Sequence, residues 1–318
     1  SINLMSRFPR LLLAAVLTIL ISAAISAQEQ KPARRFSIPA LVTTAVFAPD
    51  GATIVAWDPG GWSSWDAASG NRRGREPVIG KGCERTAALP RSADGRVIAA
   101  QCKDTLFFFD AATGRLIGDR PVAQNQTAAM YTASANGSTI AVVRAGAMNT
   151  VTVGTIAAGP SSDVKVDGEV EDLSLSASGD RLSIGTIKGV EVRESPGGKL
   201  LRTFAGRPAH ALSGDGRLLA IASDRGAQIF DVDTGNRVAE VEGRVSSLRF
   251  SPDGKRLVGW TNQRAITWDA TTGAQQLVLK SDEFVDAAIS PDGTRLVTVS
   301  LDRRGDSTSS VLAVWRLP

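Results

Sequence analysis

The sequence has little of several residue types on which common active sites depend. It contains one histidine, one tyrosine and two cysteines among 318 residues. With His210 alone, sites that need two or three imidazole rings are excluded. The chain also lacks a phosphate-binding glycine loop, a nucleophile elbow and an HExxH zinc motif. Its 36 basic and 32 acidic side chains nearly balance, unlike the strongly basic surface of nucleic-acid binders. We therefore expect no nucleic-acid partner and no cofactor.

Residues 1–27 have the features of a secretory signal peptide. Arg7 and Arg10 precede the apolar run 11–25, and the small residues Ser26 and Ala27 follow it. A short basic region, an apolar stretch of about 15 residues and an alanine exit are typical of a cleaved signal. We predict cleavage after Ala27. An uncleaved membrane anchor is the alternative, although the run is shorter than the roughly 20 residues that span a bilayer.

Cleavage would leave a chain with no stable membrane attachment. No cysteine follows the apolar run, so a bacterial lipid anchor is not expected. The chain is rich in Ala, Gly and Arg, and only 8 of its 36 basic residues are lysine, which is typical of a GC-rich bacterial genome. We predict a secreted or periplasmic protein, with a flexible linker at 28–33 before a folded domain at 34–318.

Export determines how the two cysteines are interpreted. In an oxidising compartment, an isolated pair forms a disulfide more often than a metal or redox site. Cys83 and Cys102 flank the turn 92–95, and a hairpin centred near Ala93 would bring them within about one rung of each other. The sequence predicts a disulfide between Cys83 and Cys102, and two buried free thiols are the alternative.

A unit of about 40 residues repeats along the chain, and such a period decides the whole fold. Its marker is a turn related to Ser-Pro-Asp-Gly, which ends at Gly51, Gly95, Gly137, Gly179, Gly216, Gly254 and Gly293. In one unit, the alternating stretch 245–250 precedes Pro252, Asp253 and Gly254, which favour a tight turn. Three more apolar runs and a second turn complete the unit. Four short strands per unit predict one sheet, and seven such sheets stack radially.

This pattern resembles the WD40-repeat β-propeller family over roughly residues 34–318, in particular its secreted bacterial members. An aromatic–Asp pair ends the third strand of several units, as Trp65-Asp66, Phe109-Asp110, Phe230-Asp231, Trp268-Asp269 and, altered, Trp315-Arg316. The family's Gly-His pair is missing, because His210 follows Ala209. The hydrogen-bond network that the family builds on that histidine is therefore not expected. The resemblance implies an all-β, seven-bladed β-propeller of four-stranded antiparallel blades.

The last unit is one strand short. Its apolar runs lie at 285–289, 296–299 and 311–317, and the chain then ends. A spare alternating piece, 35–38, precedes the first inner strand at 41–47. We predict that this N-terminal piece completes the last blade, because a closed ring leaves no open seam and no exposed strand edge.

We expect binding residues on the face opposite the Asp-Gly turns, where the longest irregular connections are predicted at 117–129, 157–172 and 301–310. The candidates combine aromatic and charged side chains of the kind that form binding hot spots: Trp57, Trp62, Trp260, Asp302, Arg303, Arg304 and Asp306. The alternative is that Trp57 and Trp260 fill the interfaces between blades. The acidic stretch 163–172 lacks the spacing of a calcium loop, so no metal site is predicted.

The leading hypothesis is an exported, non-catalytic, monomeric platform that binds a protein or peptide in the cell envelope. One alternative is a metal-dependent, lactonase-like propeller hydrolase, and another is a carbohydrate-binding propeller that uses Trp57, Trp62 and Trp260. Against the hydrolase stand the single histidine and the absence of carboxylates recurring at matched positions on the loop face.

Overall fold

The structure is a computed structural model that describes residues 31–58, 61–77, 88–92, 96–102, 104–110, 113–121, 128–156, 159–281, 283–304 and 307–318. The predicted signal peptide and residues 28–30 of the predicted linker lie outside this range. Within it, all regular structure is β-strand, in seven four-stranded antiparallel sheets. None of the described residues belongs to a helix that could cross a membrane.

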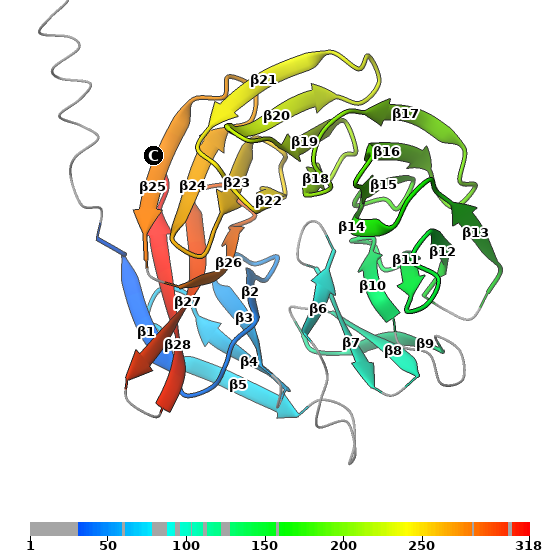
Figure 1. Cartoon of the computed structure of the whole chain (residues 1–318). Coiled ribbons are helices and arrows are strands. Elements are labelled where there is room, and N and C mark those ends of the chain that lie inside the picture. The colour runs from blue at the N-terminus through cyan, green and yellow to red at the C-terminus, as the bar shows by residue number, and fades with distance from the viewer. Residues whose placement is uncertain are drawn as a thin grey trace, which may run out of the picture. The chain divides into compact units, whose positions relative to one another are not determined.

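The seven sheets are the predicted blades, and the strands of each run in order from the innermost to the outermost (Figure 1). Blade one is β2 (Thr44–Phe47), β3 (Thr53–Asp58), β4 (Gly61–Asp66) and β5 (Arg72–Pro77). Blade two is β6 (Ala88–Arg91), β7 (Val97–Cys102), β8 (Thr105–Asp110) and β9 (Leu116–Pro121). Blade three is β10 (Ala128–Ala133), β11 (Thr139–Arg144), β12 (Thr150–Thr155) and β13 (Ser161–Lys165). Blade four is β14 (Val170–Leu175), β15 (Arg181–Thr186), β16 (Gly189–Glu194) and β17 (Leu200–Phe204).

The remaining blades follow the same order around the ring. Blade five is β18 (His210–Leu212), β19 (Leu218–Ala222), β20 (Gly226–Asp231) and β21 (Arg237–Glu242). Blade six is β22 (Ser247–Phe250), β23 (Arg256–Trp260), β24 (Arg264–Asp269) and β25 (Gln275–Lys280). Blade seven is β26 (Phe284–Ile289), β27 (Arg295–Arg304), β28 (Ser307–Arg316) and β1 (Arg34–Ile38).

The N-terminal strand completes blade seven, as predicted. β1 pairs antiparallel with β28, with Arg34 opposite Val314 and Ile38 opposite Ser310 (Figure 1). The Ile38 side chain is buried, and the ring of Phe36 stacks on Trp65 of blade one with 5.2 Å between ring centroids. The first strand of the fold therefore joins the last blade by backbone pairing and the first blade by packing.

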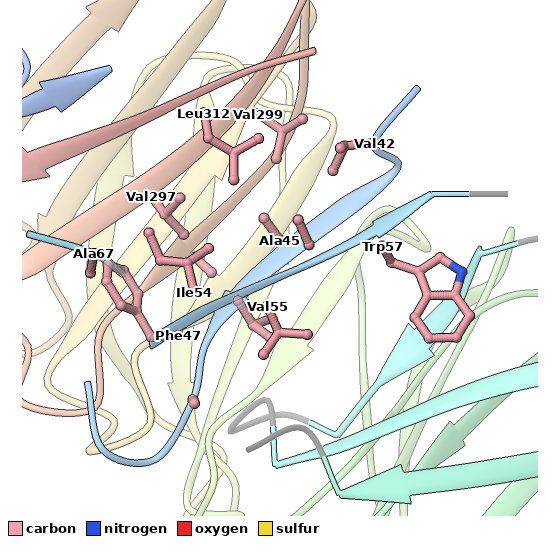
Figure 2. Close-up of a cluster of buried hydrophobic side chains, with 14 of the residues drawn as sticks. Val42, Ala45, Phe47, Ile54, Val55, Trp57, Ala67, Val297, Val299 and Leu312 are labelled. Carbon is pink, nitrogen blue, oxygen red and sulfur yellow. The ribbon is translucent and has the colours of Figure 1, made fainter. Parts of the chain in front are cut away.

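The core lies between the blades, because the apolar face of each sheet is covered by its neighbour. One cluster joins Phe47 and Ile54 of blade one to Val297 and Leu312 of blade seven, and Ile98 of blade two also belongs to it (Figure 2). Burying such faces supplies the main stabilisation of a propeller, since a single four-stranded sheet has too little apolar area to cover itself.

The repeated turns have the chemistry expected from their sequence. In blade six, the hydroxyl of Ser251 donates to Asp253 and accepts the backbone N–H of Arg256 at 2.9 Å. Gly254 follows with a φ of 71°, in the left-handed region that glycine enters without strain. The aromatic–Asp pairs close the second turn of their blades, where Asp269 accepts the N–H and the hydroxyl of Thr272. We refer to the end of the ring that carries these turns as the turn face.

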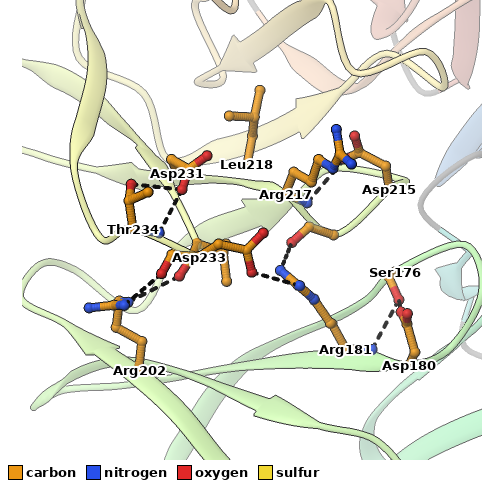
Figure 3. A network of polar contacts seen from close by, with 12 residues as sticks. Ser176, Asp180, Arg181, Arg202, Asp215, Arg217, Leu218, Asp231, Asp233 and Thr234 are labelled. Carbon is orange, nitrogen blue, oxygen red and sulfur yellow. Dashed lines mark hydrogen bonds and ion pairs between the residues drawn. The ribbon is translucent and has the colours of Figure 1, made fainter.

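Arginines on the turn face tie neighbouring blades together. Arg181 stands two residues after the turn glycine of blade four, and its guanidinium donates to the carbonyl of Gly216 at 3.0 Å and to Asp233 at 2.7 Å (Figure 3). Arg295 occupies the same position in blade seven and donates to the carbonyl of Gly51 at 2.9 Å. An arginine at the same position of the repeat thus links blade four to blade five and blade seven to blade one.

We expect the stability of the fold to decrease at acid pH because of Asp292 in the turn of blade seven. The hydroxyl of Ser290 and the N–H of Thr294 bond Asp292, and together with the nearby Arg295 they lower the pKa of its carboxyl from 3.8 to about 2. A pKa that is lower in the folded chain stabilises the fold above about pH 3.8, and this stabilisation is lost as the pH falls toward 2. Asp292→Asn removes the charge but can accept the same bonds, as Asn136 does in blade three.

The measurement is the melting temperature of wild type and Asp292→Asn at a series of pH values. The wild type should be more stable above pH 4, with a difference of only about 1–2 °C because the carboxylate is half exposed. The difference should shrink toward pH 2. A difference that stays constant with pH would contradict the role given to the ionised carboxylate.

Each of the three predicted irregular connections contains strand residues, so these predictions are wrong there. Residues 117–121 belong to β9, and residues 161–165 form β13. Residues 301–304 and 307–310 continue β27 and β28 as a paired hairpin, with Asp302 opposite Ser309. These segments are polar because they lie at an outer edge or beyond the neighbouring strands, so they lack the alternation that identifies a half-buried strand.

Candidate functional site

A cavity of about 810 Å³ occupies the centre of the ring, and all seven blades contribute to its lining. Many lining residues lie at or just before the start of an innermost strand, such as Thr43 and Thr44 at β2 and Ser246 and Ser247 at β22. These positions belong to the end of the ring opposite the turn face, which we call the entry face. Thr43 and Ser246 are exposed there. The cavity is therefore accessible from the face on which binding residues were predicted.

One wall of the cavity holds a buried ion pair. Asp286 of β26 is 4% exposed, and its Oδ1 lies 3.0 Å from Nη1 of Arg249 in β22. Oδ2 of Asp286 accepts the hydroxyl of Thr44 at 2.7 Å and the backbone N–H of Ala45 at 3.1 Å. The guanidinium of Arg249 lies over the ring of Trp260, 5.0 Å from its centroid. This wall joins blades six, seven and one.

The facing part of the lining contains the single histidine. The backbone N–H of His210 donates to Oδ2 of Asp172 in β14 at 3.1 Å. Nδ1 of the ring donates to the carbonyl of Pro208 at 2.7 Å, and Nε2 lies 2.8 Å from the hydroxyl of Ser183. The ring is fully buried, and Ser183 is buried with it, so this Asp-His-Ser arrangement has no substrate access to its hydroxyl. It ties blade four to blade five.

We expect Gly185 to be required for the packing of His210. A Cβ at this position would lie 2.2 Å from the carbonyl oxygen of Pro208 and 2.8 Å from Nδ1 of His210. Gly185→Ala should therefore lower the free energy of unfolding by about 1–3 kcal/mol, the usual cost of overpacking. Gly197→Ala is the matched control, because a Cβ there would meet nothing within 4 Å. Urea unfolding of both variants tests this, and equal stabilities would contradict the close fit around the histidine.

The three candidate tryptophans are buried. Trp57 at the end of β3 is 1% exposed, Trp62 in β4 is 9% exposed and Trp260 at the end of β23 is 7% exposed. In Figure 2, Trp57 lies on the far side of its cluster from Val297 and Leu312. Trp62 sits against Gly114 of blade two, where a Cβ would lie 1.8 Å from the indole ring. Of the three, only Trp260 lines the cavity.

The charged candidates that the structure describes lie in blade seven. Asp302 and Arg303 are in β27, and Nε of Arg303 bonds Oε2 of Glu283 at 2.9 Å. Arg304 is the last residue of β27, and Asp306 lies outside the described residues. Neither Asp302 nor Arg303 lines the cavity. The candidate set therefore does not converge on one pocket.

The predicted disulfide stays a prediction. Cys102 ends β7 and is buried, whereas Cys83 lies outside the described residues. In the acidic stretch 163–172, Asp163 accepts the hydroxyl of Thr152 and Asp167 pairs with Lys188. Among the residues that the structure describes, no group of three or more His, Cys, Asp and Glu is arranged to hold a metal ion.

Carboxylates stand at matched positions in two of the seven repeats, where the sequence analysis expected none. Asp172 and Asp286 each stand four residues before the turn serine of their blade, Ser176 and Ser290. Both follow a register shift in the innermost strand, and both accept the backbone N–H of the next blade. Aligning the repeats on the turn serine would have found them.

The comparisons with known proteins agree on the fold. The chain is similar to the crystal structure of the Cps50 (Swd1) β-propeller domain of Myceliophteria thermophila, with a TM-score of 0.67 and 14% identity over 89% of this chain and 99% of that one. It is also similar to a chain in the crystal structure of a mitotic checkpoint complex, with a TM-score of 0.66 and 16% identity over 91% of this chain and 96% of that one. These neighbours are WD40 propellers, so the fold is the one that the repeats predicted. No protein-family profile matches the sequence, and no curated protein is significantly similar to it.

Proposed function

We propose that this protein is an exported, non-catalytic platform that binds a protein or peptide partner at the mouth of the central cavity. The observation that carries the proposal is the cavity of about 810 Å³ reached from the entry face. Its lining combines hydroxyl groups, charged groups and apolar surface, the mixture that protein interfaces use. The occurrence of a similar propeller in a multiprotein complex is consistent with this role.

Site-specific photo-cross-linking tests the binding face. A cross-linking residue at Ser246, which is exposed at the cavity, should capture a discrete partner from an envelope extract. The matched control is Thr271, which is exposed on the turn face of the same blade. Capture from Thr271 and not from Ser246 would place the interface on the wrong face and contradict the proposal.

Export is a separate part of the proposal and rests on the residues before the described domain. We expect the mature chain to begin at Gln28 in the secreted or periplasmic fraction. N-terminal sequencing of protein purified from fractionated cells measures this directly. An intact N-terminus on protein found in the cytoplasm would overturn export and leave the binding platform to be tested on its own.

The hydrolase and the carbohydrate-binding alternatives are judged by different features of the structure. A metal-dependent hydrolase needs carboxylates that are free to bind a divalent ion, whereas Asp286, one of the two matched carboxylates, is buried and paired with Arg249. Metal analysis of the purified protein tests this, and one tightly bound divalent ion per chain would favour the enzyme. Carbohydrate stacking requires exposed ring faces, and Trp57, Trp62 and Trp260 are each at most 9% exposed.

A further inference from the structure

The two matched carboxylates of the cavity hold the ring together in the same way. Oδ2 of Asp286 accepts the N–H of Ala45 at 3.1 Å, and Oδ2 of Asp172 accepts the N–H of His210 at 3.1 Å. Each bond runs from the innermost strand of one blade to the innermost strand of the next. The two carboxylates therefore occupy equivalent positions of the repeat, so their remaining contacts can be compared directly.

The two carboxylates differ in whether a cationic side chain pairs with them. Asp286 has the guanidinium of Arg249 against its Oδ1 at 3.0 Å, and the guanidinium is stacked on Trp260. Asp172 has no Lys or Arg ion pair among the described residues, and 41% of its side chain is exposed. The ring of His210 lies 3.5 Å away, but its Nδ1 hydrogen is directed at the carbonyl of Pro208. Oδ1 of Asp172 instead accepts the backbone N–H of Leu173 at 2.9 Å. The molecule thus contains one version of this carboxylate site that is paired with an arginine and one that, among the described residues, is not.

The residues around Asp172 bring a second negative charge and apolar surface to this wall of the cavity. Glu171 is exposed beside it and also lines the cavity, which brings a second negative charge to this wall. Arg207 lines the cavity too, but its guanidinium pairs with Asp224. The partly buried side chains of Leu173 and Pro208 complete the wall. A long cationic side chain could pack its alkyl stem there and direct its charge to the carboxylates.

We propose that the wall formed by Glu171, Asp172, Leu173 and Pro208 binds the guanidinium group of an arginine from the partner protein. This inference rests on the proposed function and specifies its ligand. Arginine is favoured over lysine because its planar fork donates two parallel hydrogen bonds to a carboxylate, as well as stacking on apolar surface. The pair of Arg249 and Asp286 shows that this cavity accommodates a guanidinium at the equivalent carboxylate.

Selection of random peptides displayed on phage against the full chain tests the proposal, followed by calorimetry with the best peptide. We expect the selected peptides to share an arginine. Asp172→Asn, which can still accept the N–H of His210, should weaken binding roughly 10- to 100-fold, as should citrulline in place of that arginine. The two changes together should weaken binding little more than either alone, because both remove the same contact. Glu171→Gln, at an exposed position, should weaken binding in the same direction without a risk to folding.

The matched control is Asp167→Asn, which removes an acid that is 81% exposed, lies in the connection just before blade four and pairs with Lys188. It should leave the affinity of the peptide unchanged. Selected peptides without arginine, equal affinity for a lysine peptide, or binding unaffected by Asp172→Asn would overturn the inference and leave the binding platform standing. Failure to select any peptide, together with no cross-linking from Ser246, would overturn the proposed function itself.

Discussion

Deleting residues 34–39 should lower the melting temperature of the protein by about 10 °C, because the deletion removes a strand and opens the ring. The deletion removes all five residues of β1, including Ile38, which is 4% exposed, and Phe36, which stacks on Trp65. Burial of one large aliphatic side chain contributes about 1.5–3 kcal/mol. Loss of the strand also exposes the edge of β28 to water and to other chains.

The matched control is deletion of residues 28–33, which shortens the chain equally and leaves β1 in place. Its melting temperature should stay within about 2 °C of the wild type, since terminal residues that precede the first strand are expected to contribute little. Thermal unfolding followed by circular dichroism compares the two deletions. Equal losses would mean that the pairing of β1 with β28 adds nothing to the stability of blade seven.

The sequence predicted the features that depend on local chemistry. The turn serine, aspartate and glycine specify the same hydrogen bonds in one blade after another, so the repeat and the number of blades could be counted without coordinates. The outer strands of blades two and three, β9 and β13, could not be found in this way. β13 has the sequence SSDVK, and four of its five side chains are exposed, because an outermost strand meets only one neighbouring strand.

The candidate site was harder to predict, because it depends on how the blades meet. Trp57 of β3 lies opposite Trp62 of β4, and both indole side chains are buried inside the propeller. The pairing of Arg249 with Asp286 joins residues 37 positions apart, on strands of two different blades. Only the ring geometry brings their side chains together. The serine-based alignment gives the position of a carboxylate but not whether a cation accompanies it.

Asp286→Ala should be the most damaging substitution at the channel, lowering the free energy of unfolding by about 3–5 kcal/mol. It removes the carboxylate that bonds Thr44 and Ala45, and it leaves the guanidinium of Arg249 partly buried without its counter-charge. Unfolding in urea at neutral pH measures the loss. Arg249→Met should also destabilise, because it leaves the carboxylate of Asp286 buried without the guanidinium.

A double-mutant cycle separates the ion pair from the other contacts of Asp286. If the pair acts as a unit, Asp286→Ala combined with Arg249→Met should cost less than the sum of the two single changes, with a coupling of about 1–3 kcal/mol. Asp172→Ala is the control at the equivalent position, where the carboxylate is half exposed and pairs with no arginine of the part of the chain that the structure describes. It should cost about 1.5–3 kcal/mol, the value of a hydrogen bond to a charged group. Equal costs at Asp172 and Asp286 would show that Arg249 contributes nothing at its carboxylate. The comparison between the carboxylate with an arginine and the one without would then lose its physical basis.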